Sequence, residues 1–209
     1  MFVLTVAAHT SAADALRRHV LTWPAEVGTA ATGWLGSTAG VSDDGAFLLL
    51  LRFESEEASL ITSGLPSYTD WWQMCRRHLD TKPSFTPSTA VTGILAGGSD
   101  SAAAVRITQG RATPSRLEDI VRRLEVVPAS QRDDVIGGLV AWHDGGQFTE
   151  ALYLRAPPTA RLLAATSTPL GRFARDHDAA IRGARITDLR EPWLTSPSDA
   201  ASRTGREPR

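Results

Sequence analysis

Hydrophobic and polar residues in the first half of the chain follow two periods, one typical of strands and one typical of helices. Short β-prone runs alternate with segments whose apolar residues recur at helical spacing, as Leu16 and Val20 do. In chain order, the pattern predicts a strand over Phe2–Ala8, a helix after Thr10 and Ser11, a hairpin of Gly33–Ala39 and Ala46–Glu54, helical segments between Ser55 and Asp80, and a strand over Ser84–Val91. The predicted order is βαββαβ.

The second half of the chain repeats this order. Its predicted elements are strands over Ala104–Thr108, Val135–His143, Phe148–Arg155 and Arg185–Leu189, with helices over Ser115–Leu124 and Thr159–Ile181. One offset of 101 positions aligns the halves, and it pairs Leu4 with Val105, Val6 with Ile107, Leu16 with Leu117, Phe47 with Phe148 and Trp72 with Phe173. A single offset indicates duplication of one unit. We therefore expect two halves, residues 1–95 and 103–194, followed by a disordered tail over 195–209.

The strand Phe47–Phe53 is apolar at every position except Arg52. A βαββαβ unit forms an antiparallel sheet with both helices on one face, so the other face needs a covering layer. Because side chains alternate along a strand, we expect Phe47, Leu49, Leu51 and Phe53 to share one face, and Leu48, Leu50 and Arg52 the other. Two such sheets packed face to face would explain a strand that is apolar on both sides.

Composition narrows the possible partners. The formal net charge is −1, which gives no electrostatic reason to expect binding to nucleic acid or to an anionic membrane. Cys75 is the only cysteine, so an internal disulfide and a multi-cysteine metal site are both excluded. No apolar run approaches the roughly 20 residues of a membrane span, and the first residues lack the basic start of a signal peptide. We expect a cytoplasmic protein.

Several segments together resemble a known family. They are GWLGSTAGVSDDGAFLLLLRFESEEA and the Trp71-Trp72 pair in the first half, with GGLVAWHDGGQFTEALYL and ITDLREPWL in the second. The chain resembles the antibiotic biosynthesis monooxygenase group of the dimeric α/β barrel superfamily, in a form where one chain supplies both halves. The resemblance implies an α+β fold, a tandem duplication of a ferredoxin-like βαββαβ unit that forms an intramolecular dimeric α/β barrel. It also implies a pocket between each sheet and its helices for small aromatic or polycyclic molecules, with Thr62 and Ser63 where a pocket asparagine is expected.

Arg52 is the first candidate site residue. The offset pairs it with Tyr153, so two polar groups interrupt two otherwise apolar strands at equivalent positions. An arginine in such a place can bind a phenolate or carboxylate and lower its pKa. The alternative is an arginine at a strand end that forms an ion pair with Glu54 or Glu56.

Aromatic residues supply the candidate substrate-binding positions. Trp71 and Trp72 are about 100° apart on a helix, which predicts that they face different surroundings, Trp72 the sheet and Trp71 a pocket mouth, a helix interface or solvent. Tyr68 precedes Trp71 by one turn, an arrangement suited to stacking on a planar ligand. Trp34 and Trp142 lie in the first strands of the two hairpins. Core packing is the alternative for each of them.

His143 follows Trp142 and can act as a general base, or it can be an ordinary turn histidine beside Asp144. The pattern predicts that His78 and His177 are exposed helix residues with charged neighbours. No histidine pair has metal-ligand spacing and no phosphate loop or nucleophile elbow occurs, so we expect neither metal nor organic cofactor. A single histidine that ligates haem iron is an open alternative.

These features lead to three functional hypotheses. The first is an enzyme of secondary metabolism, a cofactor-independent monooxygenase in which Arg52 and Tyr153 orient an aromatic polyketide-like substrate and His143 moves a proton. The second, within the same class, is a cyclase or isomerase that rearranges a biosynthetic intermediate. The third is a non-catalytic ligand-binding barrel. Glu150 stands where the first half has Leu49, so the two halves have diverged, and pairing with another copy as a homodimer is open.

Overall fold

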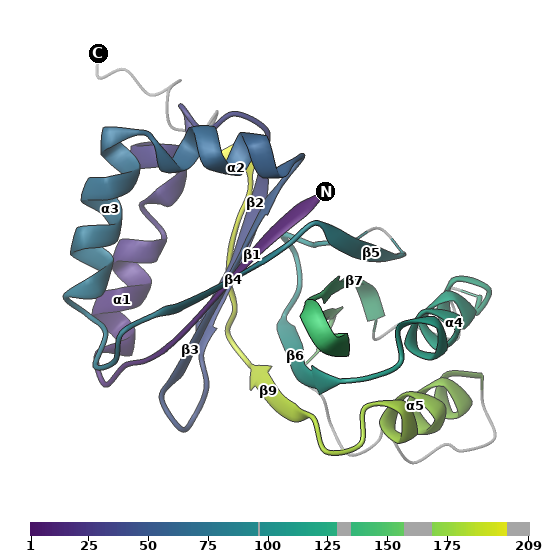
Figure 1. Cartoon of the computed structure of the whole chain (residues 1–209). Helices are drawn as coiled ribbons and strands as arrows, with labels where there is room; N and C mark the ends of the chain where they lie inside the picture. Colours follow the sequence, from purple (N-terminus) through teal and green to yellow (C-terminus); the bar gives the residue numbers. More distant parts are fainter. Residues whose placement is uncertain (96, 129–134, 157–168, 200–209) are drawn as a thin grey trace. The chain divides into compact units, whose positions relative to one another are not determined.

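The computed structural model describes residues 1–95, 97–128, 135–156 and 169–199 (Figure 1). The chain forms two compact units. One comprises Met1–Thr89 together with the segment that begins at Pro192, and the other comprises Ala90–Glu191. Within the described residues, no helix is both long enough and apolar enough to cross a membrane.

The first unit is a five-stranded antiparallel sheet with helices on one face. Its elements are β1 (Phe2–His9), α1 (Ala13–Val20), the π-helical turn η1 (Pro24–Gly28), β2 (Trp34–Val41), β3 (Ala46–Phe53), α2 (Glu56–Ser63), α3 (Pro66–Arg76), β4 (Ser84–Ser88) and β10 (Trp193–Thr195). The strand order is β10-β2-β3-β1-β4. Ser55 begins α2 because its hydroxyl accepts a hydrogen bond from the Ala58 amide at 3.1 Å, and Pro66 occupies the start of α3.

The second unit repeats this arrangement. Its elements are β5 (Ala90–Leu95), β6 (Ala104–Arg111), α4 (Pro114–Glu125), β7 (Val135–Trp142), the 3₁₀ turn η3 (Asp144–Gly146), β8 (Gln147–Leu154), α5 (Pro169–Ala180) and β9 (Arg185–Leu189). The strand order is β5-β7-β8-β6-β9. Of the helical region predicted over Thr159–Ile181, α5 is observed, and residues 157–168 lie outside the described residues. The duplicated ferredoxin-like fold is confirmed.

Each sheet also receives a fifth strand from the other half of the sequence. The strand predicted over Ser84–Val91 divides at Thr89, so that β4 pairs with β1 whereas β5 pairs with β7. In the same way, β9 pairs with β6 and β10 pairs with β2. Thr195 therefore ends a strand and is buried, while residues 200–209 of the predicted tail lie outside the described residues.

The strand registers support the duplication and correct one part of its alignment. Both hairpins contain the same irregularity, between Trp34 and Gly36 and between Val135 and Gly137. In β1, however, Val3 lies opposite Arg52, and in β6 Val105 lies opposite Tyr153. The first strands are thus offset by 102 positions, and the predicted pairing of Leu4 with Val105 is wrong. The connection to the following helix is one residue shorter in the second half, and a one-residue slip moves side chains to the other face.

The alternation predicted for β3 is confirmed. Every residue of β3 is buried, and Phe47, Leu49, Leu51 and Phe53 belong to the core cluster that contains Leu16 and Val20 of α1. Figure 1 shows α1 and α3 on one face of the first sheet, and α4 and α5 on one face of the second. Below, the helix face means the sheet face that these helices cover. The packing of the two sheets against each other stays a prediction.

Candidate functional site

Five aromatic side chains form a continuous cluster on the helix face of the first sheet. The Trp23 ring lies 6.1 Å from that of Trp34, 5.9 Å from Tyr68 and 4.9 Å from Trp71, measured between centroids. Trp72 continues the cluster at 5.1 Å from Trp71 and 6.3 Å from Tyr68. Most contacts are edge-to-face, the arrangement that aromatic rings favour. The cluster brings four of the five predicted substrate-binding residues together.

Trp71 and Trp72 face different neighbours, as predicted. The Trp72 ring contacts Phe85 of β4, 5.2 Å between centroids, whereas Trp71 lies at a helix interface, one of the three surroundings predicted for it, where its ring stacks on His19 of α1 at 5.0 Å. Both are buried in the same core cluster, Trp71 with 1% of its surface exposed and Trp72 with 7%, because α3 packs against η1 and α1 as well as on the sheet. Tyr68 contacts Trp72, four residues later, rather than stacking with Trp71.

This cluster contains hydrogen-bond donors but no strong base. The indole N–H groups of Trp23, Trp34 and Trp71 are buried and have no partner among the described residues. Burial raises the pKa of the Tyr68 phenol, and the nearby Trp72 indole acts weakly in the opposite direction without reaching good hydrogen-bond geometry. Burial also raises the pKa of the Cys75 thiol to about 12, which makes it a poor nucleophile. The five aromatic side chains can donate hydrogen bonds, but none of them is a base suited to proton transfer.

The helix face of the second sheet carries a buried acid–base pair instead. Nε2 of His177, on α5, lies 2.9 and 2.8 Å from the two carboxylate oxygens of Glu150, on β8. Glu150 has no exposed surface and His177 is 5% exposed. The prediction that His177 is exposed is therefore wrong, because His177 follows Phe173 by four residues and shares its buried side of α5. The two rings stack with centroids 5.4 Å apart.

Further charged residues surround this pair. Arg106 on β6 donates two hydrogen bonds to Asp188 on β9, from Nε at 2.7 Å and from Nη2 at 2.9 Å. Thr108, opposite Glu150 in the ladder, is buried and its hydroxyl has no partner among the described residues. Burial acts to lower the pKa of His177, but the charge and hydrogen bond of Glu150 outweigh it, with a smaller contribution from Asp178, and raise that pKa. The raised pKa means that Glu150 favours the protonated form of His177, so that the two side chains form a buried ion pair.

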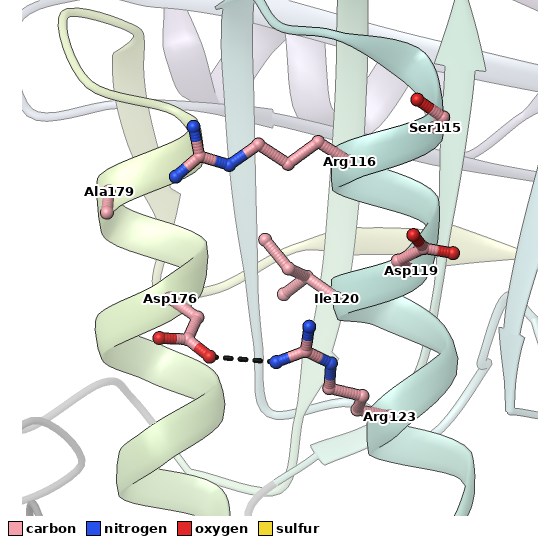
Figure 2. A pocket seen from close by; sticks show the side chains of 7 residues that line it. All are labelled: Ser115, Arg116, Asp119, Ile120, Arg123, Asp176 and Ala179. Carbon is pink, nitrogen blue, oxygen red and sulfur yellow. Dashed lines mark hydrogen bonds and ion pairs between the residues drawn. The ribbon is translucent and has the colours of Figure 1, made fainter.

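A groove runs between α4 and α5 on the same side of the sheet. One part, about 420 Å³, is lined by Ser115, Arg116, Asp119, Ile120, Arg123, Asp176 and Ala179. Figure 2 shows Arg116 and Arg123 of α4 facing α5 across it, with Arg123 paired to Asp176 at 2.9 Å. The adjoining part, about 290 Å³, is more apolar and includes Phe173. Phe173 lines this part and also stacks on His177, whereas His177 itself does not line either part.

The three residues predicted to be catalytic lie apart from this acid–base pair. Arg52 and Tyr153 occupy equivalent positions of β3 and β8, and both are buried on the sheet face opposite the helices. Arg52 forms no ion pair with Glu54 or Glu56, so that alternative is wrong. His143 follows β7 and its Nε2 lies 3.1 Å from the Thr149 hydroxyl. Trp142 is half-buried and packs near Phe148, 5.8 Å between centroids.

The contact between Glu150 and His177 was not predicted, although the sequence carried a signal for each residue. Glu150 interrupts an apolar strand where the first half has Leu49, and the spacing of four from Phe173 to His177 indicates a shared buried side. The charged neighbours of His177 concealed this. Among the described residues, no three His, Cys, Asp or Glu side chains come together as a metal site.

Comparison with known proteins supports the fold. No family model matches the sequence, and no curated protein matches it either. Two solved structures of putative monooxygenases are similar over the whole chain. The one from Lactobacillus acidophilus has a TM-score of 0.68 and 10% identity, covering 94% of this chain and 96% of that one. The one from Fusobacterium nucleatum has a TM-score of 0.67 and 8% identity, covering 93% and 94%.

A third similar structure is that of an anthrone oxidase-like protein. Its TM-score is 0.55 at 12% identity, covering 94% of this chain and 93% of that one. All three likenesses extend over both halves, so the duplicated arrangement of this chain also occurs in solved proteins. At this level of identity they establish a shared fold, in agreement with the family resemblance seen in the sequence.

Proposed function

We propose that this protein is a small-molecule enzyme that oxygenates an aromatic, polyketide-like substrate without a metal or organic cofactor. One observation carries the proposal: the buried Glu150–His177 pair on the helix face of a fold that monooxygenase-like proteins share. A carboxylate that holds a histidine in one orientation is a common arrangement for general base catalysis. This pair therefore replaces His143 as the proposed proton acceptor.

The proposed reaction needs only a base, a dry site and dioxygen. Transfer of a proton from an acidic C–H or phenolic O–H group to the pair leaves a substrate anion, which is more easily oxidised. Dioxygen then takes the electrons. One of its oxygen atoms forms the new carbonyl of the product, and the other leaves as water with the two substrate hydrogens. Burial of Glu150 and His177 keeps bulk water from competing for the proton.

A cyclase or isomerase is the second candidate, and the same pair favours it. Proton removal and return at carbon rearranges a substrate without any oxidant, and one imidazole that alternates between its neutral and charged forms can perform both steps. A binding protein without catalysis is the remaining alternative. It is less well supported, because a buried acid–base pair often costs stability compared with apolar residues and a binding site does not require one.

Turnover with dioxygen tests the proposal. We suggest anthrone as a trial substrate, with an oxygen electrode and ¹⁸O₂ to follow oxygen consumption and incorporation. Glu150→Gln and His177→Gln should each lower kcat about 10²- to 10⁴-fold, the usual contribution of a general base, whereas Arg123→Gln in the groove serves as a matched control for surface charge. Product formation without oxygen uptake would favour the isomerase. Equal rates for wild type and both variants would refute the role of the pair.

A further inference from the structure

We propose that the first unit contains a binding site for a divalent transition-metal ion between His19 of α1 and His78, which follows the end of α3. The centroids of the two imidazole rings lie 6.1 Å apart, and the ring planes are inclined by 50°. Both side chains are half-buried, and both belong to the first unit. The spacing of histidines along the chain gave no sign of this pair, because the fold brings its members together from two different helices.

The separation of the two rings suits imidazoles that bind one ion. A nitrogen–metal bond is about 2.0–2.1 Å long and the ring adds about 1.1 Å from nitrogen to centroid, so two such rings have centroids at most about 6.4 Å apart. The observed 6.1 Å lies below this limit. Tetrahedral geometry requires about 5.2 Å, which a shift of about 1 Å in one ring supplies.

His19 is already oriented as a metal ligand. Its Nε2–H donates a hydrogen bond to the Trp71 carbonyl oxygen at 2.8 Å, and its ring stacks on the Trp71 indole with centroids 5.0 Å apart. Because a carbonyl oxygen only accepts, the neutral ring carries its proton on Nε2 and its lone pair on Nδ1. Metal-binding histidines commonly donate their second ring nitrogen to a carbonyl or carboxylate group in this way. Nδ1 of His19 is therefore available as a ligand on a ring that is held in place.

His78 combines a fixed backbone with a ring that can turn. Its amide donates to the Cys75 carbonyl oxygen at 3.0 Å, and its own carbonyl oxygen accepts from the Thr10 hydroxyl at 2.6 Å. Within the part of the chain that the structure describes, its ring makes no hydrogen bond. Rotation about the side-chain bonds of His78 can therefore bring a ring nitrogen toward Nδ1 of His19 while the backbone stays in place.

The type of donor atom, rather than charge, selects the ion. Each histidine follows two arginines, at positions 17–18 and 76–77, so the local charge does not attract cations in general. Imidazole nitrogen suits copper, nickel and zinc, whereas magnesium and calcium take oxygen ligands. Two protein ligands leave the other coordination positions to water, so we expect exchangeable binding with a Kd of about 1–100 µM, tightest for Cu²⁺.

The second unit supports the placement of the two histidines but lacks the site. The offset of 101 positions puts Ile120 and Ala179 in place of His19 and His78, and both line the groove between α4 and α5 (Figure 2). The same two positions thus face one groove in the second copy of the fold and meet in the first. The metal site is independent of the Glu150–His177 pair and of the proposed reaction.

Metal titrations of the untagged full chain test the site without any turnover. After metals are removed with EDTA, we would add Zn²⁺ and, separately, Mg²⁺ in a calorimeter, and record electron paramagnetic resonance spectra with Cu²⁺. The wild type should bind one Zn²⁺ and no Mg²⁺, and its copper spectrum should show coupling to two nitrogen nuclei. His19→Gln and His78→Gln should each weaken zinc binding about 10- to 100-fold. His9→Gln, which replaces an exposed histidine of the same unit, is the matched control and should bind zinc as the wild type does.

Unchanged zinc affinity in either His19→Gln or His78→Gln would overturn the site, as would binding of Mg²⁺ as tight as that of Zn²⁺. Absence of binding at millimolar Zn²⁺, or its loss in His9→Gln, would also contradict it. Thermal unfolding separates metal binding from folding, because an ion that binds only the folded chain raises Tm. Zn²⁺ should raise the Tm of the wild type but not that of the double variant, and an equal rise in both would mean that zinc binds to other groups only. In EDTA, His78→Gln should keep the wild-type Tm, since its ring makes no hydrogen bond among the described residues.

Discussion

Arg52 in the first unit and Glu150 in the second are buried charged side chains that lie on opposite faces of equivalent sheets. In the first unit the helix face is apolar, with Leu49 in the core cluster, and the buried charge is Arg52 on the other face. In the second unit Glu150 occupies the position of Leu49 on the helix face, and Tyr153 occupies that of Arg52. The two copies have thus kept the same backbone fold, but the buried charge lies on the helix face in one copy and on the opposite face in the other.

This inversion shows which positions the shared fold requires and which it leaves open. Trp72 and Phe173 are equivalent, and both are 7% exposed against their own sheets, as expected of scaffold positions. Glu150 and Arg52, by contrast, have apolar or aromatic counterparts that fit the same backbone. Each βαββαβ unit has its own hydrophobic core beneath its helices. A charged residue in the core of one unit therefore does not require a charged residue at the equivalent position of the other.

The largest effect is expected from the aromatic core of the first unit. Trp71→Ala should lower the free energy of unfolding by about 3–5 kcal/mol, because it leaves a cavity at a side chain that is 1% exposed. Urea unfolding followed by circular dichroism measures this. Trp142→Ala in the second unit is the matched control, and it should cost less because Trp142 is only half-buried. A loss below about 1 kcal/mol for Trp71→Ala would mean that this cluster is loosely packed and open to a ligand.

The acid–base pair gives the next largest effect. Glu150→Ala should cost about 3–5 kcal/mol, because it leaves His177 buried without its counter-ion. Replacing both Glu150 and His177 with leucine gives the second unit an apolar core at this position, as the first unit has around Leu49. That double variant should be about as stable as the wild type or more stable, since apolar groups often replace a buried ion pair without loss. Calorimetric unfolding of single and double variants decides the point. A double variant as unstable as Glu150→Ala would show that the backbone of this unit requires the charges.

The pH dependence of stability should distinguish the two units. The pKa of His177 is raised in the folded state, so its stabilising contribution is complete below the unfolded pKa of about 6.5. That contribution is lost as the pH rises through the higher folded pKa. The free energy of unfolding of the wild type should therefore fall in this range above pH 6.5, whereas His177→Gln should fall less. His78→Gln in the first unit, used as the control, should retain the wild-type slope. Parallel curves for wild type and His177→Gln would contradict the assignment.

Local patterns were enough to predict the elements and their duplication. The run Ser42–Gly45 between two apolar segments indicated the first hairpin, and the same order of elements recurred in the second half. The strand exchange was not predictable, because Ser84–Leu95 reads as nearly continuous β-prone sequence. Which sheet each part joins depends on contacts with β1 and β7, which are distant along the chain.

The candidate site was less predictable than the fold for a similar reason. The sequence singled out Arg52 because it is the one charged residue in an otherwise apolar strand. The structure adds that Gly36 lies opposite Arg52, where the absence of a side chain leaves space for the guanidinium. Helix periodicity separated Trp71 from Trp72 but left three surroundings open for Trp71, because periodicity alone does not reveal that α3 is covered on two sides. His177 was misplaced because its neighbours Asp176 and Asp178 are charged, and its partner is on a strand 27 residues away.

The smallest effect is expected at the groove between α4 and α5. Arg123→Ala removes an ion pair whose side chains are 61% and 46% exposed, so solvent and salt screen it and the free energy of unfolding should change by less than about 0.5 kcal/mol. The equivalent positions of the first unit hold Thr22 and Cys75, without any ion pair between helices. The two helix pairs therefore do not need this contact to pack on their sheets. A loss above about 1 kcal/mol, or a strong dependence of Tm on salt that disappears in Arg123→Ala, would show that charge holds α4 and α5 together.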